Sequence, residues 1–376
     1  MRATKAIIHL NNLIHNLKAV RKRVGEKPLI CVPVKADGYG HGAVQVSKTA
    51  LENGASKLLV ATVDEGVILR EAGIEADIFL ITQALPEELE TLIASRLTPF
   101  ISDKSYAADL KRAAAKLGKR SEVYLKIDTG MGRMGSRPED AVELAQFIAE
   151  QKNLHHTGTV THLAVSDSAD SGDIEFTQKQ IRIFNETIDG IRKAEIDPGI
   201  ISAANSGGVI THDISWFDMV RPGIFTYGYQ EPEQKPDLEG KPVMEFVTQV
   251  ALVKKVLKGE SVSYGRTWTA PEDTYIGVLP AGYADGLPRT LSVKTINSAG
   301  FFVVINGEKY PLIGRICMDQ CMINLGPLPK VKLHDKVILF GPDAPALSAA
   351  GVATRIGTIS YEVCCNINKR VPRVYV

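Results

Sequence analysis

The sequence predicts an α/β protein, a (β/α)8 TIM barrel followed by a mainly β C-terminal domain. Up to about residue 230, short apolar runs alternate with amphipathic charged segments, a pattern typical of strands and helices around a parallel sheet. A segment rich in proline, glycine and charge follows at 228–242, and beyond it the strand-like runs have little helical periodicity between them. We therefore expect residues 1–235 to form the barrel and residues 236–376 to form the β domain.

Eight apolar runs account for the expected barrel strands. They are 29–34, 57–62, 77–81, 98–101, 122–127, 158–163, 200–203 and 218–221. The segments between them, such as KSYAADLKRAAAKLGK and PEDAVELAQFIAEQ, place Ala, Leu, Glu and Lys at helical spacing with an apolar face. Eight such alternations favour a closed barrel, and a doubly wound open sheet is the alternative that this pattern leaves open.

Five later runs are expected to be strands of the β domain, because glycine or proline follows or interrupts them and no helical spacing connects them. They are FVTQVALVKKV (246–256), TYIGVLP (274–280), FFVVING (301–307), CMINL (321–325) and KVILFG (336–341).

The charge balance favours a small-molecule partner. Forty-four Lys and Arg face forty-three Asp and Glu, so a net charge of +1 offers no field for nucleic acid or an anionic membrane. With no apolar stretch of signal-peptide or membrane-spanning length, we expect a soluble cytoplasmic protein. Five cysteines without a CxxC pair indicate reduced thiols, and the histidine spacing predicts no metal site.

Polar residues follow the expected strands at the end where a barrel holds its active site. Lys35 follows the first run, Arg133 follows the fifth, and His162 ends the sixth. The loops after the seventh and eighth runs offer glycine-exposed N–H groups and hydroxyls that suit a phosphate. They contribute Ser206, Gly207, Gly208, Gly223 and Ile224.

A lysine opposite a phosphate cradle suggests pyridoxal 5'-phosphate, since the amine of Lys35 can form an imine while the phosphate anchors the other end. Taken singly, each feature also fits a surface lysine, a turn, a helix cap or a structural histidine. Their combination at matching strand ends favours the cofactor site.

Nine motifs resemble the alanine racemase family. They are VPVKADGYGHG (32–42), KIDTGMGRMG (126–135), THLAVSD (161–167), AANSGG (203–208), RPGIFTYG (221–228), VSYGRTW (262–268), GYADGLPR (282–289), GRICMDQ (314–320) and SYEVCC (360–365). They span nearly the whole chain in the family's order. The resemblance implies a barrel plus β domain, a homodimer, pyridoxal phosphate, and interconversion of L- and D-alanine that supplies D-alanine for peptidoglycan.

The resemblance also implies a two-base mechanism, because inverting a Cα centre needs proton-transfer groups on opposite faces. Lys35, which would carry the cofactor as an aldimine, covers one face, and Tyr264 covers the other. Behind Tyr264, His162 and Arg221 form a hydrogen-bonded relay. From the sequence alone, Tyr264 would pass for a half-buried strand tyrosine.

The remaining roles implied by the resemblance concern cofactor and substrate contacts. Arg221 faces the pyridine nitrogen and, as a guanidinium that keeps its proton, leaves this nitrogen unprotonated. Arg133 holds the phenolic oxygen and the substrate carboxylate, which also meets the backbone N–H of Met318. Lys126 matches a position that carries a carbamate in some members. The phosphate contacts are Tyr39, Ser206, Gly223, Ile224 and Tyr361.

Three alternatives remain at this stage. The first is a racemase of broader specificity that also accepts serine, because a pocket discriminates only weakly against a substrate with one additional small group. A related pyridoxal-phosphate decarboxylase of basic amino acids would need a different acid, often a cysteine, where Tyr264 stands. A non-catalytic pyridoxal-phosphate carrier would resemble the barrel alone.

The resemblance also implies how the dimer is built: in the alanine racemase family, the β domain of one subunit closes over the barrel of its partner.

Overall fold

The computed structural model describes residues 2–230, 238–292, 300–342 and 347–376. The chain divides into two compact units, a barrel unit of Asn12–Lys241 and a β unit of Met1–Asn11 with Pro242–Val376. The segment before Asn12, which we expected in the barrel, thus belongs to the β unit. The domain boundary expected between residues 235 and 236 lies outside the described residues.

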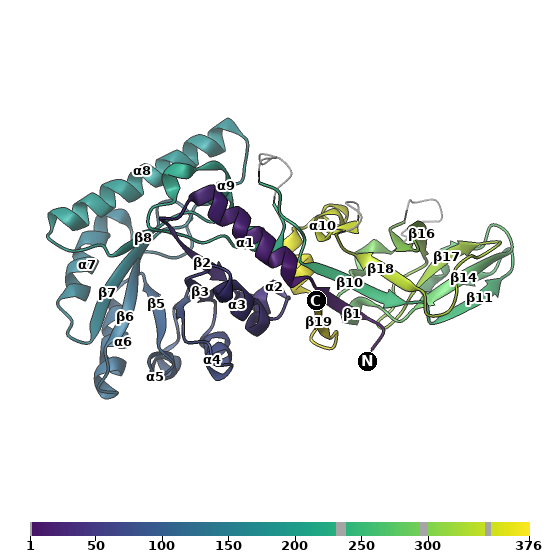
Figure 1. Ribbon diagram of the computed structural model, residues 1–376, viewed down its shortest axis with the longest axis horizontal. Helices are drawn as coiled ribbons and strands as arrows, with labels where there is room; N and C mark the ends of the chain where they lie inside the picture. Colours follow the sequence, from purple (N-terminus) through teal and green to yellow (C-terminus); the bar gives the residue numbers. More distant parts are fainter. Residues whose placement is uncertain (1, 231–237, 293–299, 343–346) are drawn as a thin grey trace. The chain divides into compact units, whose positions relative to one another are not determined.

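The barrel unit is a closed eight-stranded parallel barrel, which confirms the expected (β/α)8 fold (Figure 1). The strands follow one another in sequence order, and β9 pairs with β2 through Leu29↔Met219 and Ile30↔Val220 to close the ring. Each strand overlaps one of the eight apolar runs. They are β2 (Leu29–Pro33), β3 (Lys57–Val60), β4 (Asp77–Leu80), β5 (Leu97–Ile101), β6 (Ser121–Lys126), β7 (Leu154–Val160), β8 (Ile200–Ser202) and β9 (Met219–Val220).

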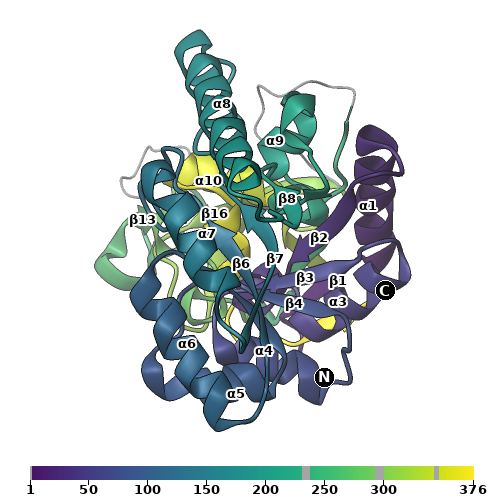
Figure 2. The same cartoon turned by 90° about the vertical axis from the view of Figure 1, so that its left-hand side faces the viewer.

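Helices cover the outside of the barrel strands, as Figure 2 shows for α4 to α7. The bounds are α1 (Leu10–Val24), α3 (Ala43–Glu52), α4 (Val63–Glu71), α5 (Leu89–Ala94), α6 (Lys104–Lys116), α7 (Ala141–Ala149), α8 (Ser171–Lys193) and α9 (Ser206–Thr211). Side-chain caps fix several starts: Asp103 accepts from Tyr106 N–H before α6, and Asp170 accepts from Gly172 N–H before α8. No helix in the described part of the chain combines the length and apolar composition needed to cross a membrane.

The barrel interior is filled by an aromatic cluster. Phe79, Phe100 and Tyr124 are buried, and the rings of Phe79 and Tyr124 lie 4.6 Å apart. Gly158 on β7 makes room for this packing, since a Cβ there would lie 2.2 Å from the Tyr124 ring. A barrel filled in this way is a packed core, so chemistry is confined to the strand ends and their loops.

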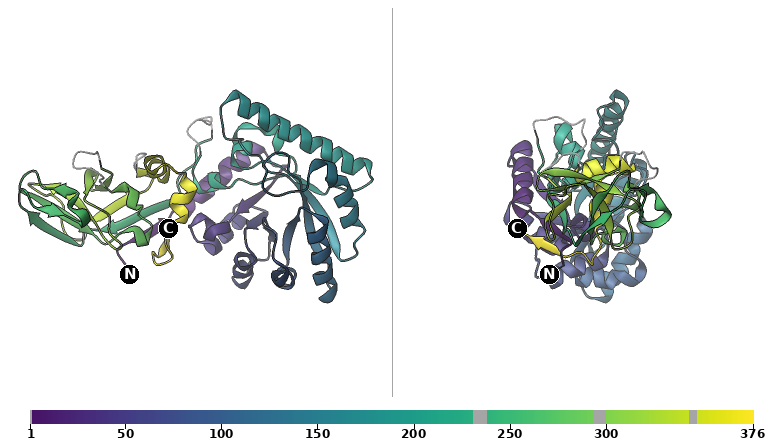
Figure 3. Two further views of the ribbon diagram at one scale, coloured as in Figure 1. Left: turned by 180° about the vertical axis from the view of Figure 1, so that it is seen from behind. Right: turned by 90° about the vertical axis from the view of Figure 1, so that its right-hand side faces the viewer.

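The described residues of the β unit form a nine-stranded sheet, in the order β11-β14-β17-β16-β15-β18-β10-β1-β19, seen from two further sides in Figure 3. The bounds are β1 (Lys5–Ile8), β10 (Met244–Gln249), β11 (Leu252–Val256), β14 (Thr274–Leu279), β15 (Phe302–Ile305), β16 (Glu308–Ile313), β17 (Cys321–Gly326), β18 (Lys336–Phe340) and β19 (Arg373–Tyr375). A small hairpin of β12 (Ser261–Val262) and β13 (Trp268–Thr269) and the helices α10 (Ala349–Ile356) and α11 (Ser360–Cys365) complete the unit.

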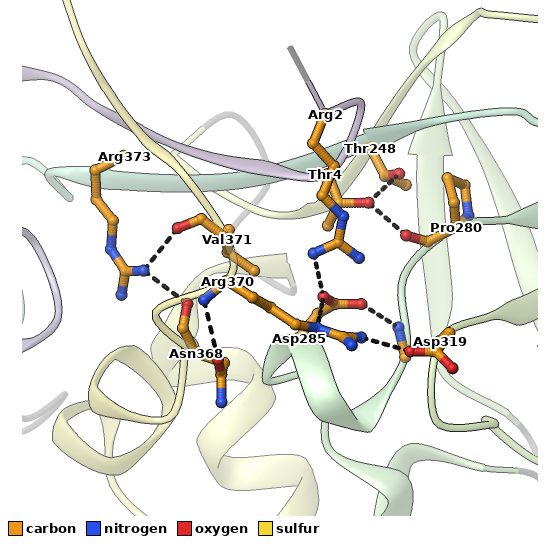
Figure 4. Close-up of polar contacts among 11 residues, drawn as sticks. Arg2, Thr4, Thr248, Pro280, Asp285, Asp319, Asn368, Arg370, Val371 and Arg373 are labelled. Atoms are coloured by element: carbon orange, nitrogen blue, oxygen red, sulfur yellow. Dashed lines mark hydrogen bonds and ion pairs between the residues drawn. The ribbon is translucent and has the colours of Figure 1, made fainter.

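A buried carboxylate joins distant segments of the β unit (Figure 4). The Asp285 side chain is inaccessible to solvent, and its Oδ1 accepts from Arg2 at 2.5 Å and from Arg370 at 2.7 Å. Arg370 also contacts Asp319 at 2.8 Å. Burial raises the pKa of Asp285, but hydrogen bonds from Arg2 and Arg370 outweigh it and hold the pKa below its ordinary value. The network fixes the loop that carries Met318, because Asp319 is the next residue.

Candidate active site

Lys35 stands directly after β2, at the start of a left-handed turn. The segment α2 (Lys35–Tyr39) has positive φ at Ala36, Asp37, Gly38 and Tyr39, with values between 52° and 62°. Side chains with a Cβ rarely adopt this conformation, and successive residues in it are rarer still. The turn is therefore a strained feature, and it must be held by its surroundings.

Glu65 on α4 provides one of these restraints. Its Oε1 accepts from the backbone N–H of Ala36 at 2.6 Å, and its Oε2 accepts from Ala61 N–H at 2.8 Å and from Thr62 N–H at 3.4 Å. One carboxylate thus fastens the Lys35 turn to the loop after β3. Sequence analysis did not identify Glu65; its capping-box spacing with Thr62 was the available signal.

Three of the expected phosphate contacts meet in the barrel unit. A Cβ built on Gly223 would lie 3.1 Å from the Tyr39 hydroxyl oxygen and 3.9 Å from Ser206 Oγ. Ser206 Oγ also accepts from Phe225 N–H at 3.2 Å. Two hydroxyls and a glycine therefore surround one small space, the composition that suits a phosphate group. Ile224 begins the turn Ile224–Tyr227 beside it.

The Tyr39 ring is held in place by aromatic packing. It is 6% exposed and stacks on Tyr227 with ring centroids 4.8 Å apart. Tyr227 in turn donates its hydroxyl to Pro33 O at 2.8 Å, at the end of β2. The Lys35 Nζ lies 6.0 Å from the Tyr39 ring centroid, so the lysine and the hydroxyl cluster share one end of the barrel.

Arg221 is a buried cation fixed by several acceptors. Its Nη2 donates to Thr161 O at 2.6 Å and to Ala203 O at 3.1 Å, and its Nη1 donates to Ser202 Oγ. Burial lowers the pKa of Arg221 to about 10, so the guanidinium stays protonated at neutral pH. Its plane is fixed by these bonds across β7, β8 and β9.

Further titratable groups lie around Arg221. Lys126 at the end of β6 is 3% exposed, and burial, followed by the charges of Arg221 and Arg133, lowers its pKa to about 7. Burial and the same cations hold the pKa of His162 well below its ordinary value, so its imidazole is neutral at neutral pH. Arg133 itself is exposed in the loop after β6. This end of the barrel is cationic and suits an anionic ligand.

The other three expected site residues belong to the β unit. Tyr264 lies in the turn between β12 and β13 with 71% of its surface exposed, and Met318 is 53% exposed. Tyr361 is half-buried on α11. The Met318 carbonyl accepts from Ala284 N–H at 3.0 Å, which fixes its backbone.

Comparison with known proteins covers both units. The family domain described as "Alanine racemase, N-terminal domain" matches residues 8–231, and "Alanine racemase, C-terminal domain" matches residues 243–375. The alanine racemase of Treponema denticola is 50% identical over 381 residues, covering 100% of this chain and 99% of that protein. The alanine racemase of Treponema pallidum is 42% identical, covering 100% of both.

Solved structures agree with the sequence comparison. The alanine racemase of Clostridium difficile 630 is similar with a TM-score of 0.93 and 33% identity, covering 100% of this chain and 96% of that one. The alanine racemase of Bacillus anthracis with bound L-Ala-P has a TM-score of 0.91 and 31% identity, covering 100% of this chain and 95% of that one.

Proposed function

Because the chain belongs to the alanine racemase family, we propose that it interconverts L-alanine and D-alanine, in the cytoplasm and for cell-wall peptidoglycan. The observation that carries the proposal is the arrangement at one end of the barrel. There Lys35 follows β2, while the hydroxyls of Tyr39 and Ser206 converge on Gly223. An amine and an anion cradle on one rigid scaffold suit an amino-acid reaction that depends on pyridoxal phosphate.

The proposed cofactor is pyridoxal 5'-phosphate. The space at Gly223, which a Cβ would fill, fits a phosphate with two hydroxyl donors beside it. When bound, the cofactor withdraws electrons from the substrate Cα and so makes its proton removable. The residues that would hold it are Lys35, Tyr39, Arg133, His162, Ser206, Arg221, Gly223, Ile224 and Tyr361.

Arg221 has the properties of a donor to the cofactor's ring nitrogen. Its guanidinium is protonated at neutral pH and its Nη atoms are anchored to Thr161, Ala203 and Ser202. A guanidinium donates a hydrogen bond without giving up its proton, so Arg221 would leave the ring nitrogen of a bound cofactor unprotonated. Such an arrangement favours brief ionisation of Cα over side reactions.

Racemisation needs two proton-transfer groups, one on each face of Cα. In our proposal, Lys35 Nζ exchanges the proton on one face and Tyr264 Oη exchanges it on the other. The substrate carboxylate is oriented by Arg133 and by the backbone N–H of Met318. The neutral imidazole of His162 and the cation of Arg221 support the ionisation of Tyr264 through a hydrogen-bonded relay.

The exposure of the β-unit residues supports a homodimer with shared sites. A catalytic tyrosine and a substrate contact would be poorly placed in open solvent, yet Tyr264 is 71% and Met318 is 53% exposed in the single chain. A second copy covering them would exclude water from the reaction. We therefore propose that the β unit of one subunit completes the barrel site of its partner.

A circular-dichroism racemisation assay over a panel of L-amino acids, with added pyridoxal phosphate, tests the function. We expect L-alanine to lose its optical signal fastest, with serine or 2-aminobutyrate slower by about 10- to 200-fold, since a hydroxyl or methylene is weakly rejected. Release of CO2 from lysine or ornithine would instead indicate a decarboxylase. Cofactor binding without turnover of any amino acid would support a carrier and contradict the proposal.

A further inference from the structure

The turn that carries Tyr264 has an unusual backbone. Ser263 has φ 70° and ψ 178°, Gly265 has φ 71°, and Arg266 has φ 50°. The Ser263 conformation is one that residues with a Cβ rarely adopt. Within the hairpin the turn is held by the pairs Ser261↔Thr269 and Val262↔Trp268 and by Arg266 Nε, which donates to Ser261 Oγ at 2.9 Å. A hairpin this short is marginally stable by itself.

A second restraint comes from a segment about fifty residues later. Ser263 Oγ donates to Arg315 O at 2.7 Å, and Cys317 Sγ lies 3.6 Å from the same hydroxyl oxygen. The backbones approach closely, since a Cβ on Gly314 would lie 2.8 Å from Ser263 Cβ. On the other side of the turn, a Cβ on Gly265 would lie 2.9 Å from the Arg315 guanidinium carbon.

The same segment continues into Met318. Cys317 N–H donates to Gln320 O at 2.8 Å, and the carbonyls of Cys317 and Met318 accept from Tyr283 N–H and Ala284 N–H. The hydroxyl of Ser263 thus joins the Tyr264 turn to a loop whose own backbone is fixed. Tyr264 is 71% exposed in the single chain, so the position of its backbone is the main constraint on where the phenol can lie.

From this geometry we infer that Ser263 is a positioning residue, whose hydroxyl holds the strained turn so that Tyr264 Oη and the Met318 N–H keep a fixed relation. The inference rests on the proposed function, in which Tyr264 exchanges a proton with Cα. Without the bond to Arg315 O, the Ser263 backbone can relax toward common φ values. Tyr264 would then move away from its working position, and a displacement near 1 Å can cost about a hundredfold in rate.

The test compares Ser263→Ala with the wild-type holoenzyme. Thr274→Val is the matched control, since Thr274 Oγ1 donates to Asn324 Oδ1 at 2.8 Å elsewhere in the β unit. L- and D-alanine have equal free energies, so kcat/KM must fall by the same factor in both directions. We expect a fall of about ten- to a hundredfold in Ser263→Ala and little change in the control.

Isotope effects separate positioning from a general loss of folded enzyme. In Ser263→Ala, the primary effect of Cα deuterium should rise for the enantiomer whose proton goes to Tyr264 and should not rise for the other. A smaller population of intact sites would lower kcat and leave both isotope effects unchanged. Hydrogen exchange should also accelerate at residues 262–267 in Ser263→Ala, and the control should match wild type there.

Two outcomes overturn the inference: a Ser263→Ala enzyme with wild-type kcat/KM, or one with lower activity but unchanged isotope effects. Wild-type enzyme that fails to racemise alanine would contradict the proposed function instead. In that case, exchange at residues 262–267 still reports whether Ser263 holds the turn, so the two failures are distinguishable.

Discussion

Lys126 is a buried amine in surroundings that disfavour its protonated form. Burial, Arg221 and Arg133 lower its pKa to about 7, and Asp128 is the nearby group that opposes them. Within the described residues, no carboxylate lies at ion-pair distance from its Nζ. A neutral amine can attack CO2 through its lone pair, form an N–C bond and release a proton, which gives an anionic carbamate. Such an anion would suit the neighbouring guanidinium of Arg133.

We therefore predict a carbamate on Lys126. With labelled bicarbonate, carbon-13 NMR should detect a carbamate resonance that grows between pH 6 and 8, because the neutral fraction of an amine with a pKa near 7 rises in that range. Lys126→Ala should remove the resonance. The absence of a resonance, or one that persists in Lys126→Ala, would reject the modification.

The lowered pKa of the Lys126 amine also predicts that the free energy of unfolding depends on pH in CO2-free buffer. Its pKa is 10.5 in the unfolded chain and about 7 in the folded one. Between these values the unfolded state binds more protons, so the free energy of unfolding should rise with pH from about 7 to 10.5 and be independent of this group below pH 6. Lys126→Met should flatten this rise in urea titrations. An equal slope in both proteins would contradict the assigned pKa.

At the scale of single elements, the left-handed turn of Lys35–Tyr39 depends on Glu65. Glu65→Ala leaves three backbone N–H groups without their carboxylate partner, so we expect a stability loss of about 1–3 kcal/mol and a fall in kcat/KM of about tenfold or more. Glu65→Gln keeps one acceptor oxygen, so its stability and its kcat/KM should lie between those of the wild type and Glu65→Ala.

The control for Glu65 is Glu88→Ala, since Glu88 also accepts from a backbone N–H, that of Leu85 at 2.7 Å, away from the Lys35 turn. Thermal unfolding and alanine kinetics measure both effects. Equal activity losses in the two variants would show that the Glu65 contact has no specific role at Lys35.

The barrel strands were predictable because each overlaps a short apolar run that has polar segments on both sides. The elements that sequence analysis missed lack that signature. The β19 strand has three residues, β16 contains Pro311, and β1 ends two residues before α1 begins. These strands form because neighbouring strands of the sheet pair with them. Such pairing is a tertiary effect, and the local sequence pattern gives no sign of it. The helices α10 and α11 lie in a region where we expected little helical periodicity.

The candidate site shows the same limit. Lys35, Arg133 and His162 were identifiable from their position after strands, and Tyr264 and Met318 from the family motifs alone. The supporting contacts were not identifiable, because they join distant segments, although the capping-box spacing marks Glu65 itself as a helix cap. Ser263 and Arg315 are 52 positions apart, and Ala36 and Glu65 are 29 apart. A single sequence gives no signal for such pairs.

At the scale of the whole molecule, β1 brings the N-terminal segment beside the C-terminal strand β19. In the sheet, β1 pairs with β10 and β19, and Ala6 and Ile8 are fully buried. Deleting residues 2–8 exposes the edges of β10 and β19 that pair with β1, and it removes the Arg2 contact to Asp285. We expect a large loss of stability, since burial of Ile8 alone contributes about 1.5–3 kcal/mol.

Calorimetry should find the melting temperature of this deletion well below that of Arg2→Ala, which removes the ion pair and keeps the strand. In Arg2→Ala the buried Asp285 carboxylate keeps its partner Arg370, so the loss of Arg2 alone should cost less than the loss of the strand. Equal melting temperatures for the deletion and Arg2→Ala would mean that the pairing of β1 contributes little.

The proposed shared site makes a prediction about mixed dimers. Lys35 belongs to the barrel unit and Tyr264 to the β unit, and each single variant, Lys35→Ala or Tyr264→Ala, should be inactive. If the two residues of one site come from different chains, a heterodimer of the variants has one site with both lesions and one with none. Random reassortment makes half of the dimers mixed, so about a quarter of wild-type activity should return.

If both residues came from one chain, every site of a heterodimer would keep one lesion. Activity near zero would then persist after mixing, although tagged pull-down would recover both variants together. The two variants are mixed by denaturing and refolding them together. Lys35→Ala alone, denatured and refolded in the same way, controls for activity gained by the treatment itself. Recovery must also depend on dimer formation, so dilution that separates the subunits should abolish the regained activity while each chain stays folded.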